Sequence, residues 1–347
     1  MKILFHAIGD MNTASSRIRA YGFAKELKKY GINTEVLSGI PKYIRLDKIL
    51  GNDIIYFQKA SDVPSYIIHT LSRLIGKRTI FDLDDSIFLR DKGVVIQQYA
   101  KSREMMRNSH IVIVASRYLY ENAKKLNSSV FLVPTSIDLQ IYNPEKFKRS
   151  NNDDLVTIGW IGSGKSHEEN LKMLVEPLKK VGKTYDIRFI LVGSQGSKKI
   201  EEMFENLENV NVEIIENLDW SDPTQAPKEI AKFDVGVMPL LGNDWSKAHY
   251  YKTLEYMAME IPAVVSAIGE NNYIIKDGIN GFLVSNEKEW IAKIKKLIED
   301  EEFRKEMGVN GRETIEEKYS MEVNGKKLAK ILISSFEGDS SLHNSMH

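Results

Sequence analysis

The chain contains no cysteine among its 347 residues. This absence excludes a disulfide framework, a thiol nucleophile and a zinc site built from cysteine ligands. Proteins that manage without disulfides are typical of reducing compartments, so a cytoplasmic location is expected.

An excess of charge of either sign is also missing. Lys plus Arg and Asp plus Glu number 48 each, so no overall field favours a nucleic acid as partner. No apolar run is long enough to cross a bilayer, and the apolar core of MKILFHAIGDM is too short for a signal peptide. We therefore expect substrates to be met in the cytoplasm or at the inner face of the membrane.

What is present is a repeated alternation of strand and helix. Helical patterns stand between many of the strands, among them the amphipathic segments 168–181 and 287–298. Such alternation predicts an α/β protein of two doubly wound, Rossmann-like domains facing a central cleft, with the polar stretch NPEKFKRSNNDD as linker. The apolar runs that predict strands are KILFHAI, NTEVLSG, DIIYFQ, RTIFDL, HIVIVAS, VFLVP, LVTIGWIG, IRFILVGS, NVEIIE, FDVGVMPL, IPAVVS and GFLVS.

IFDLDDSIF, residues 80–88, is a strand that runs into acidic residues, as in haloacid dehalogenase-like phosphatases. In that interpretation Asp82 is a nucleophile, and Ser116 at the end of HIVIVAS is its partner. The later acidic pair that should hold magnesium is Asp153 and Asp154, which precede a strand instead of following one. The phosphatase is therefore the weaker alternative.

GWIGSGKS, residues 159–166, matches the phosphate-loop pattern G-x-x-x-x-G-K-S of NTPases. Against an NTPase, Trp160 and Ile161 continue the preceding strand, and no later strand ends in a magnesium-binding Asp. A phosphate still fits this turn, because free backbone amides are expected at Gly162, Ser163 and Gly164, with charge added by Lys165. The alternative is an ordinary glycine-bearing turn between strand and helix.

SKAHYYKTLEYMAMEIPAVVS, residues 246–266, places Lys252 and Glu255 on one helical face, which by itself indicates a solvated i,i+3 ion pair. Together with FDVGVMPL before it and GENNYIIKDGINGFLV after it, the segment resembles the donor-binding half of retaining GT-B glycosyltransferases, the group 1 family numbered 4. The similarity extends over residues 1–335, including IGWIGSGKSHEENL, EEFRKEMGVNGRETIEEKYS, SSRIRAYGFAKELKKYGI, FDLDDSIF and SRYLYENAKKLNSSVFLVPTSIDLQIYNP.

The resemblance implies a domain organisation. Residues 1–148 would form an N-terminal, acceptor-side domain and residues 153–320 a C-terminal domain that binds a nucleotide sugar. A helix at 321–336 would pack back toward the N-terminal domain, and residues 337–347 would be a disordered tail.

The resemblance also implies an activity. The expected enzyme is a hexosyltransferase that moves a sugar from a UDP- or GDP-sugar, with retention and without a metal or other cofactor, to a glycan or lipid-linked acceptor in polysaccharide assembly. Two alternatives from this fold class stay open: a nucleotide-sugar epimerase and a non-catalytic nucleotide-sugar-binding subunit.

Site residues follow position by position. Glu255 matches the family glutamate that accepts hydrogen bonds from the ribose, a role that suits a carboxylate. Lys247 stands where the family has another glutamate near the donor sugar, and with Lys165 it would stabilise the departing diphosphate. The other expected donor-binding residues are Gly162, Ser163, Gly164, His249, Tyr250, Lys252, Gly269 and Glu270.

Departures from the family pattern leave gaps in this assignment. Ser163 replaces the arginine that follows the turn glycine, and Tyr273 replaces a glutamate in the later glycine-rich turn. His167 and His249 fall beside the expected phosphate site, although no histidines have metal-ligand spacing.

The first domain offers two further pairs. Arg17 and Arg19 lie early in a helix, where positive charge opposes the helix dipole, so a phosphate of donor or acceptor would offset the cost. The alternative is two solvated arginines. Asp84 and Asp85 would orient acceptor or donor hydroxyls, with capping of the next turn as the structural alternative.

SYIIHTLSRLIGKR, residues 65–78, is amphipathic with a basic edge that includes Arg73 and Lys77. Such a helix would make peripheral contact with anionic lipid. The alternative is an ordinary surface helix.

Overall fold

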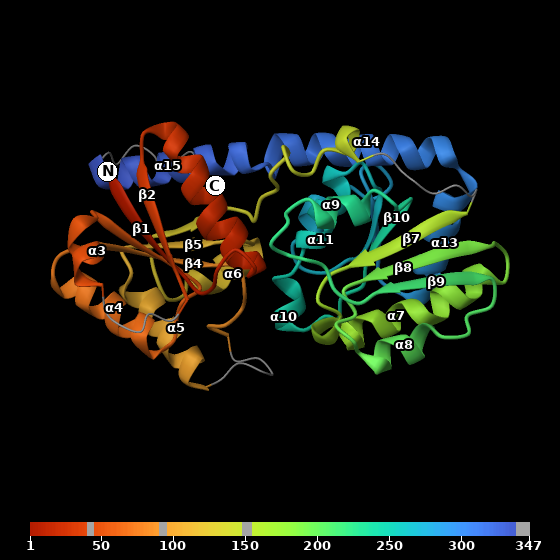
Figure 1. Cartoon of the computed structure of the whole chain (residues 1–347), viewed down its shortest axis with the longest axis horizontal. Coiled ribbons are helices and arrows are strands. Elements are labelled where there is room, and N and C mark those ends of the chain that lie inside the picture. The colour runs from red at the N-terminus through yellow and green to blue at the C-terminus, as the bar shows by residue number, and fades with distance from the viewer. Residues whose placement is uncertain (40–44, 90–95, 148–154, 338–347) are drawn as a thin grey trace. The chain divides into compact units, whose positions relative to one another are not determined.

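The computed structural model describes residues 1–39, 45–89, 96–147 and 155–337, which divide into two compact units (Figure 1). The first unit comprises Met1–Asp138 and Tyr319–His347, and the second comprises Leu139–Lys318. The expected tail and most of the expected linker lie outside the described residues.

The first unit is built on a six-stranded parallel sheet in the order β2-β1-β3-β4-β5-β6. Each strand predicted in this half is confirmed. The registers begin with Lys2 opposite Asn33 in the pair β1–β2. The strands are β1 (Lys2–Ala7), β2 (Asn33–Ser38), β3 (Ile54–Gln58), β4 (Arg78–Leu83), β5 (Ile111–Val114) and β6 (Val130–Leu132).

Helices connect these strands, and local signals explain where several of them begin. Asp62 caps α4 by accepting a 3.0 Å hydrogen bond from the amide of Ser65, and Ser116 caps α6 in the same way. The helical elements are α1 (Ala14–Ser16), the π-helix η1 (Arg17–Gly22), α2 (Phe23–Leu27), η2 (Lys28–Tyr30), α3 (Leu46–Gly51), α4 (Val63–Leu74), α5 (Ile96–Asn108), α6 (Arg117–Ala123) and α15 (Met321–Glu337).

The second unit repeats the architecture with a parallel sheet in the order β12-β11-β10-β7-β8-β9. Both predicted amphipathic helices are present, as α7 and α13. The strands are β7 (Val156–Ile161), β8 (Ile187–Val192), β9 (Val210–Ile215), β10 (Val235–Met238), β11 (Ala263–Ser266) and β12 (Phe282–Val284). The helical elements are η3 (Pro144–Lys146), α7 (Gly164–Gly182), α8 (Lys198–Phe204), α9 (Gln225–Ile230), α10 (Asp244–Lys247), α11 (Tyr251–Ala258), α12 (Asn271–Ile274), α13 (Glu287–Glu299) and α14 (Glu301–Lys318).

Burial explains the near-continuous apolar character of the strands. Every residue of β8 other than Arg188 is buried, and all four residues of β10 are buried. Strands covered by helices on both faces expose no alternating polar set, so they appear in the sequence as apolar runs. Trp160 and Trp290 are the largest side chains fully buried in the core of the second unit.

The first unit ends at Asp138 rather than at the expected residue 148. The reason is that Tyr142 bonds into the second unit: its hydroxyl donates to Glu255, and its carbonyl accepts from Arg312. The chain re-enters the first unit at Tyr319, where Ile137 pairs with Ser320 and α15 packs against α2. None of the helices in the described part of the chain combines the length and apolar character that a bilayer crossing needs.

Candidate nucleotide-sugar site

The second unit changes its direction of winding between β7 and β10. Strand β7 pairs with β8 on one side and with β10 on the other, so the loops that follow β7 and β10 diverge. Crevices at the carboxyl ends of strands, at such a switch point, are where doubly wound sheets bind ligands. The predicted residues after these strands therefore meet where a ligand is expected.

The turn after β7 differs from a phosphate loop. Gly159, Trp160 and Ile161 all belong to β7, so only a short turn separates strand from helix, which contradicts the NTPase alternative. The free amides expected at Gly162 and Gly164 are also not found. They donate to Val192 (2.9 Å) and Gly193 (2.7 Å), because the ladder with β8 continues into the turn.

Lysine side chains therefore supply most of the charge at this turn. Gly162 has a φ of +152°, and a Cβ there would lie 2.2 Å from Cε and 2.8 Å from Nζ of Lys252. The ammonium of Lys252 thus lies directly beside the turn, and it also stands 5.2 Å from the ring centre of Trp160. Lys165 is exposed at the start of α7. The expectation that Lys252 lies on a solvated helical face is wrong, because its side chain points toward Gly162 and Trp160.

Burial lowers the pKa of Lys252 to about 8, and Glu255 partly opposes this shift. A lysine with a pKa of about 8 is mostly protonated at pH 7, is half-protonated near pH 8 and is largely neutral above pH 9. An anion bound beside it would raise its pKa again and complete its protonation.

An aromatic cluster surrounds Lys252. His167 packs edge-on between Trp160 and Trp245, with ring centres 5.5 and 5.0 Å away. His249 lies against Trp245 at 4.0 Å, and its Nδ1 is 2.6 Å from the Trp245 carbonyl oxygen. These side chains come from β7, α7 and the loop after β10, so the fold alone brings them together.

Glu255, the expected ribose ligand, is buried on α11. Its Oε1 accepts a 2.5 Å hydrogen bond from the hydroxyl of Tyr142. Nothing in the local pattern around Tyr142 signals this role, because the two residues are 113 positions apart. Tyr250, a further expected donor contact, is buried as the residue that precedes α11.

Lys247 and the later glycine turn are connected through the backbone. Gly269 has a φ of +59°, and a Cβ there would lie 2.2 Å from the carbonyl oxygen of Lys247. The ammonium of Lys247 forms a 3.0 Å ion pair with Asp244, so part of its charge is already balanced. Glu270, expected to contact the donor, has a fully buried side chain.

The first unit has its own switch point between β1 and β3. Directly after β3, Lys59 adopts a left-handed backbone with φ of +56°, and its ammonium lies 2.8 Å from Asp85 and 3.9 Å from Asp84. Burial by itself would lower the pKa of Lys59, but the two carboxylates outweigh it and raise the pKa overall. The sequence analysis did not identify Lys59 as a site residue. Its position directly after β3, at the carboxyl end of a strand beside the switch point, could have indicated it. Asp85 also caps locally, through a 2.7 Å bond from the Ser86 amide.

Both hypotheses for Arg19 are wrong. Its guanidinium is fully buried and binds both carboxylate oxygens of Asp82, so it meets neither a phosphate nor solvent. The same contact overturns the phosphatase alternative, since Asp82 is fully buried and engaged. Arg17 is only partly buried and donates to the Met11 carbonyl at 2.9 Å. Among the described residues, no group of three or more His, Asp or Glu is placed to hold a metal ion.

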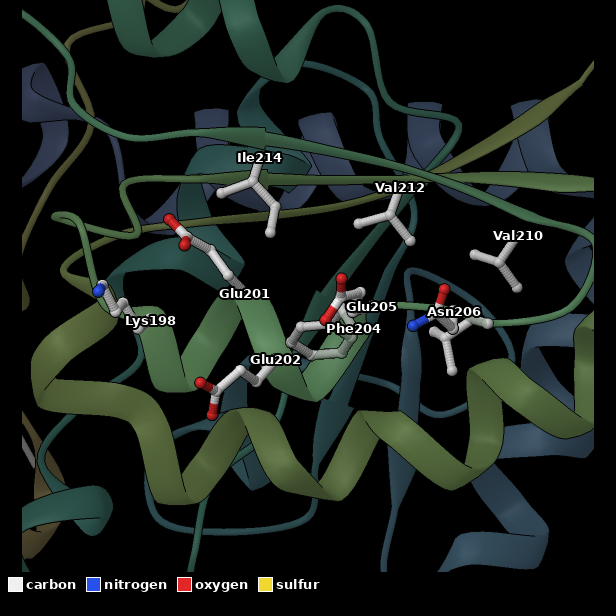
Figure 2. Close-up of a pocket in the computed structure, with 10 residues that line it drawn as sticks. Lys198, Glu201, Glu202, Phe204, Glu205, Asn206, Val210, Val212 and Ile214 are labelled. Carbon is white, nitrogen blue, oxygen red and sulfur yellow. The ribbon is translucent and has the colours of Figure 1, made fainter.

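A separate groove of about 640 Å³ lies in the second unit between α8 and β9 (Figure 2). Apolar side chains that include Phe204, Val212 and Ile214 line it, together with Lys198 and the acidic Glu201, Glu202 and Glu205. None of the predicted site residues lines it. Its acidic side chains would repel a diphosphate, so the donor site is assigned to the switch point.

Comparison with known proteins bears on the family and the fold of the chain. Residues 156–300, somewhat less than half of the chain, match the family model described as glycosyl transferases group 1. The capsular polysaccharide biosynthesis glycosyltransferase CapM of Staphylococcus aureus is 27% identical over 185 residues, which cover 52% of this chain and 46% of CapM. The chain thus spans about half the length of this curated relative. Together these findings support the group 1 glycosyltransferase family.

Solved structures share the architecture at low identity. Sucrose-phosphate synthase from Thermosynechococcus elongatus superposes with a TM-score of 0.75 and 13% identity, covering 97% of this chain and all of that one. HepE from Anabaena, solved in complex with UDP and glucose, superposes with a TM-score of 0.73 and 16% identity. The superposition covers 96% of this chain and 100% of the HepE chain. These likenesses show that the fold is GT-B, as expected from the sequence.

Proposed function

We propose that the chain is a hexosyltransferase that moves a sugar from a UDP- or GDP-sugar to a hydroxyl of a glycan or lipid-linked acceptor. Retention at the anomeric carbon, independence of metals and a role in cell-surface polysaccharide assembly complete the proposal. The observation that carries it is the position of the Lys252 ammonium beside the Gly162 turn, within the segment that matches the family model. The names of the relatives support it too, since CapM acts in capsular polysaccharide biosynthesis and HepE binds UDP and glucose.

In this proposal the donor lies at the switch point of the second unit. When the bond between sugar and phosphate breaks, negative charge develops on the departing diphosphate, and fixed positive charge stabilises it. Lys252 supplies that charge beside the turn. Lys165 in the first turn of α7 and Lys247 at the end of α10 would add to it. Glu255, held by Tyr142, accepts hydrogen bonds from the ribose, because a carboxylate has lone pairs beyond the one that Tyr142 uses.

The acceptor is assigned to the first unit. Asp84 and Asp85 have carboxylate oxygens to receive hydroxyl donors, and Lys59 holds Asp85 in place. Arg17 is retained as a contact for an acceptor phosphate, whereas Arg19 is not.

We also propose that the first unit contacts anionic lipid, although not through the basic edge that was expected for residues 65–78. Helix α4 ends at Leu74, and the Lys77 ammonium donates to the carbonyls of Leu50 and Asn52, so Lys77 is not on a free helical edge. Three apolar side chains of this region are exposed, namely Leu50 (60%), Leu74 (78%) and Ile75 (47%). Sedimentation with phosphatidylglycerol vesicles should fall in Leu74→Asp and stay unchanged in Leu241→Asp; equal sedimentation of both would refute this surface.

The decisive test of the function is the melting temperature with UDP, GDP, ADP and ATP, each with magnesium and with EDTA. A rise with UDP or GDP that survives EDTA is expected. A rise with ATP and magnesium alone would contradict the proposal. Incubation with labelled donor then separates the remaining classes: transfer or slow hydrolysis marks the transferase, an inverted sugar carbon marks an epimerase, and an unchanged donor marks a binding subunit.

A further inference from the structure

His167 connects the two sides of the candidate phosphate site. Its Nδ1 lies 3.0 Å from the carbonyl oxygen of Ser163, and its Nε2 lies 3.0 Å from Nζ of Lys252. Nδ1 also lies 3.1 Å from Oγ of Ser166, whose hydroxyl donates to the same Ser163 carbonyl at 2.9 Å. Because that carbonyl only accepts and the Ser166 proton is already used there, we place the ring proton on Nδ1. The lone pair of Nε2 is then directed at the ammonium, which donates to it.

The surroundings keep this imidazole fixed and neutral. The ring is 5% exposed and packs between Trp160 and Trp245. Burial first, and then the charges of Lys252 and His249, lower the pKa of His167 to about 2. It therefore accepts a hydrogen bond throughout the physiological pH range and never competes with Lys252 for a proton.

Lys252 depends on such an acceptor. The charged and titratable groups around it are His167, His249 and Glu255, and it lies over the face of Trp160. An ammonium that loses a hydrogen-bond acceptor in a partly buried site is destabilised relative to the neutral amine. The acceptor thus controls both where the side chain points and how much of it is charged near neutral pH.

We propose that His167 is a positioning residue that holds the Lys252 ammonium against the Gly162 turn, where it faces the diphosphate of the donor. This inference rests on the proposed function for the identity of the ligand. The role of His167 toward Lys252 itself does not depend on the ligand.

The test compares His167→Phe with His167→Gln in the full chain. Phenylalanine keeps a ring between the two tryptophans but removes the polar contacts with Ser163, Ser166 and Lys252, whereas glutamine retains a donor and an acceptor. His69→Phe is the matched control, because His69 is also buried and bonds a serine, but in the first unit. Two quantities are measured: the titration midpoint of the Lys252 13Cε resonance, assigned with Lys252→Arg, and the Kd of UDP between pH 7 and 9.5.

In His167→Phe we expect a lower Lys252 midpoint and UDP binding about tenfold weaker at pH 7.5. In His167→Gln most of the affinity should return. Near pH 9.5 wild type and His167→Phe should converge, because Lys252 is then largely neutral in both. A purely structural role of the ring would weaken binding equally at every pH.

An unchanged Lys252 midpoint in His167→Phe would overturn the proposal, as would an equal loss of UDP affinity in His69→Phe. If the wild-type chain binds neither UDP nor GDP, the proposed function fails, and the Lys252 midpoint alone decides the role of His167.

Discussion

The guanidinium of Arg19 and the carboxylate of Asp82 form a fully buried ion pair, with the shortest contact at 2.5 Å. Burial alone would lower the pKa of Arg19, but the adjacent carboxylate outweighs it and raises the pKa. The pair joins the π-helix η1 to β4, and Arg19 also donates to the carbonyl of Val133 at 3.1 Å. The pair therefore stabilises the first unit just before the acidic residues Asp84 and Asp85 that follow β4. Because it is fully buried, we assign it a structural role and no contact with a substrate.

Arg19→Ala and Asp82→Ala should each lower the free energy of unfolding by about 3–5 kcal/mol, because the remaining charge is buried without its partner. All four tryptophans belong to the second unit, so urea unfolding followed by circular dichroism should shift more than unfolding followed by tryptophan fluorescence. Arg45→Ala, which breaks the exposed pair with Asp47, should cost far less, because solvent screens that pair. Equal costs at the two sites would contradict this account.

Gly162→Ala should displace Lys252 as well as strain the turn, since the added Cβ falls 2.2 Å from Cε of that lysine. We expect UDP binding about tenfold weaker or worse by calorimetry, together with a lower melting temperature. Gly242→Ala is the control, because a Cβ there meets nothing within 4 Å. Undiminished affinity in Gly162→Ala would separate Lys252 from the phosphate site.

Glu255→Gln should weaken the binding of both UDP and GDP by about tenfold, since it removes a charged acceptor for the ribose hydroxyls. Glu260→Gln provides the comparison, because Glu260 is exposed just beyond the same helix. The same measurement is made with a 2′,3′-dideoxy nucleotide, which lacks the ribose hydroxyls. If Glu255→Gln weakens its binding to the same degree, Glu255 stabilises the protein structure and does not contact the ribose.

Asp85→Asn should reduce turnover about tenfold or more through loss of hydroxyl positioning, while the Kd of UDP stays within about twofold. Steady-state rates with labelled donor and equilibrium binding supply the two numbers. Asp47→Asn, an exposed carboxylate of the same unit, should change neither. Unchanged turnover in Asp85→Asn would leave Asp85 only structural roles, namely its ion pair with Lys59 and its capping bond to Ser86.

Acid should destabilise the first unit through His69. Burial first, and then Arg73 and His110, lower the pKa of His69 to about 4 from an ordinary value of 6.5. Between these values the unfolded chain binds a proton that the folded chain does not, so stability falls as pH drops from 6.5 toward 4. In urea titrations, wild type should lose stability relative to His69→Gln between pH 7 and 5. Above pH 7.5 the difference between their free energies of unfolding should not change with pH. If that difference also stays constant between pH 7 and 5, His69 is not the group responsible for the loss of stability in acid.

The sequence alone determined the architecture. All twelve strands and both amphipathic helices were predictable, because strand and helix leave a local hydrophobic period that needs no knowledge of the rest of the chain. The turn at Gly162 and the helix with Lys252 and Glu255 were also located correctly.

What only the tertiary structure decided is how the polar side chains are paired. Arg19 with Asp82, Lys252 with His167 and Glu255 with Tyr142 are 63, 85 and 113 residues apart. The amides of Gly162 and Gly164 were expected to be free, yet they donate to the last residue of β8, Val192, and to Gly193 directly after it. Hydrophobic periodicity specifies which face of an element is buried, but a hydrogen bond or ion pair depends on distances of a few tenths of an ångström. Those distances exist only once the strands have been placed side by side.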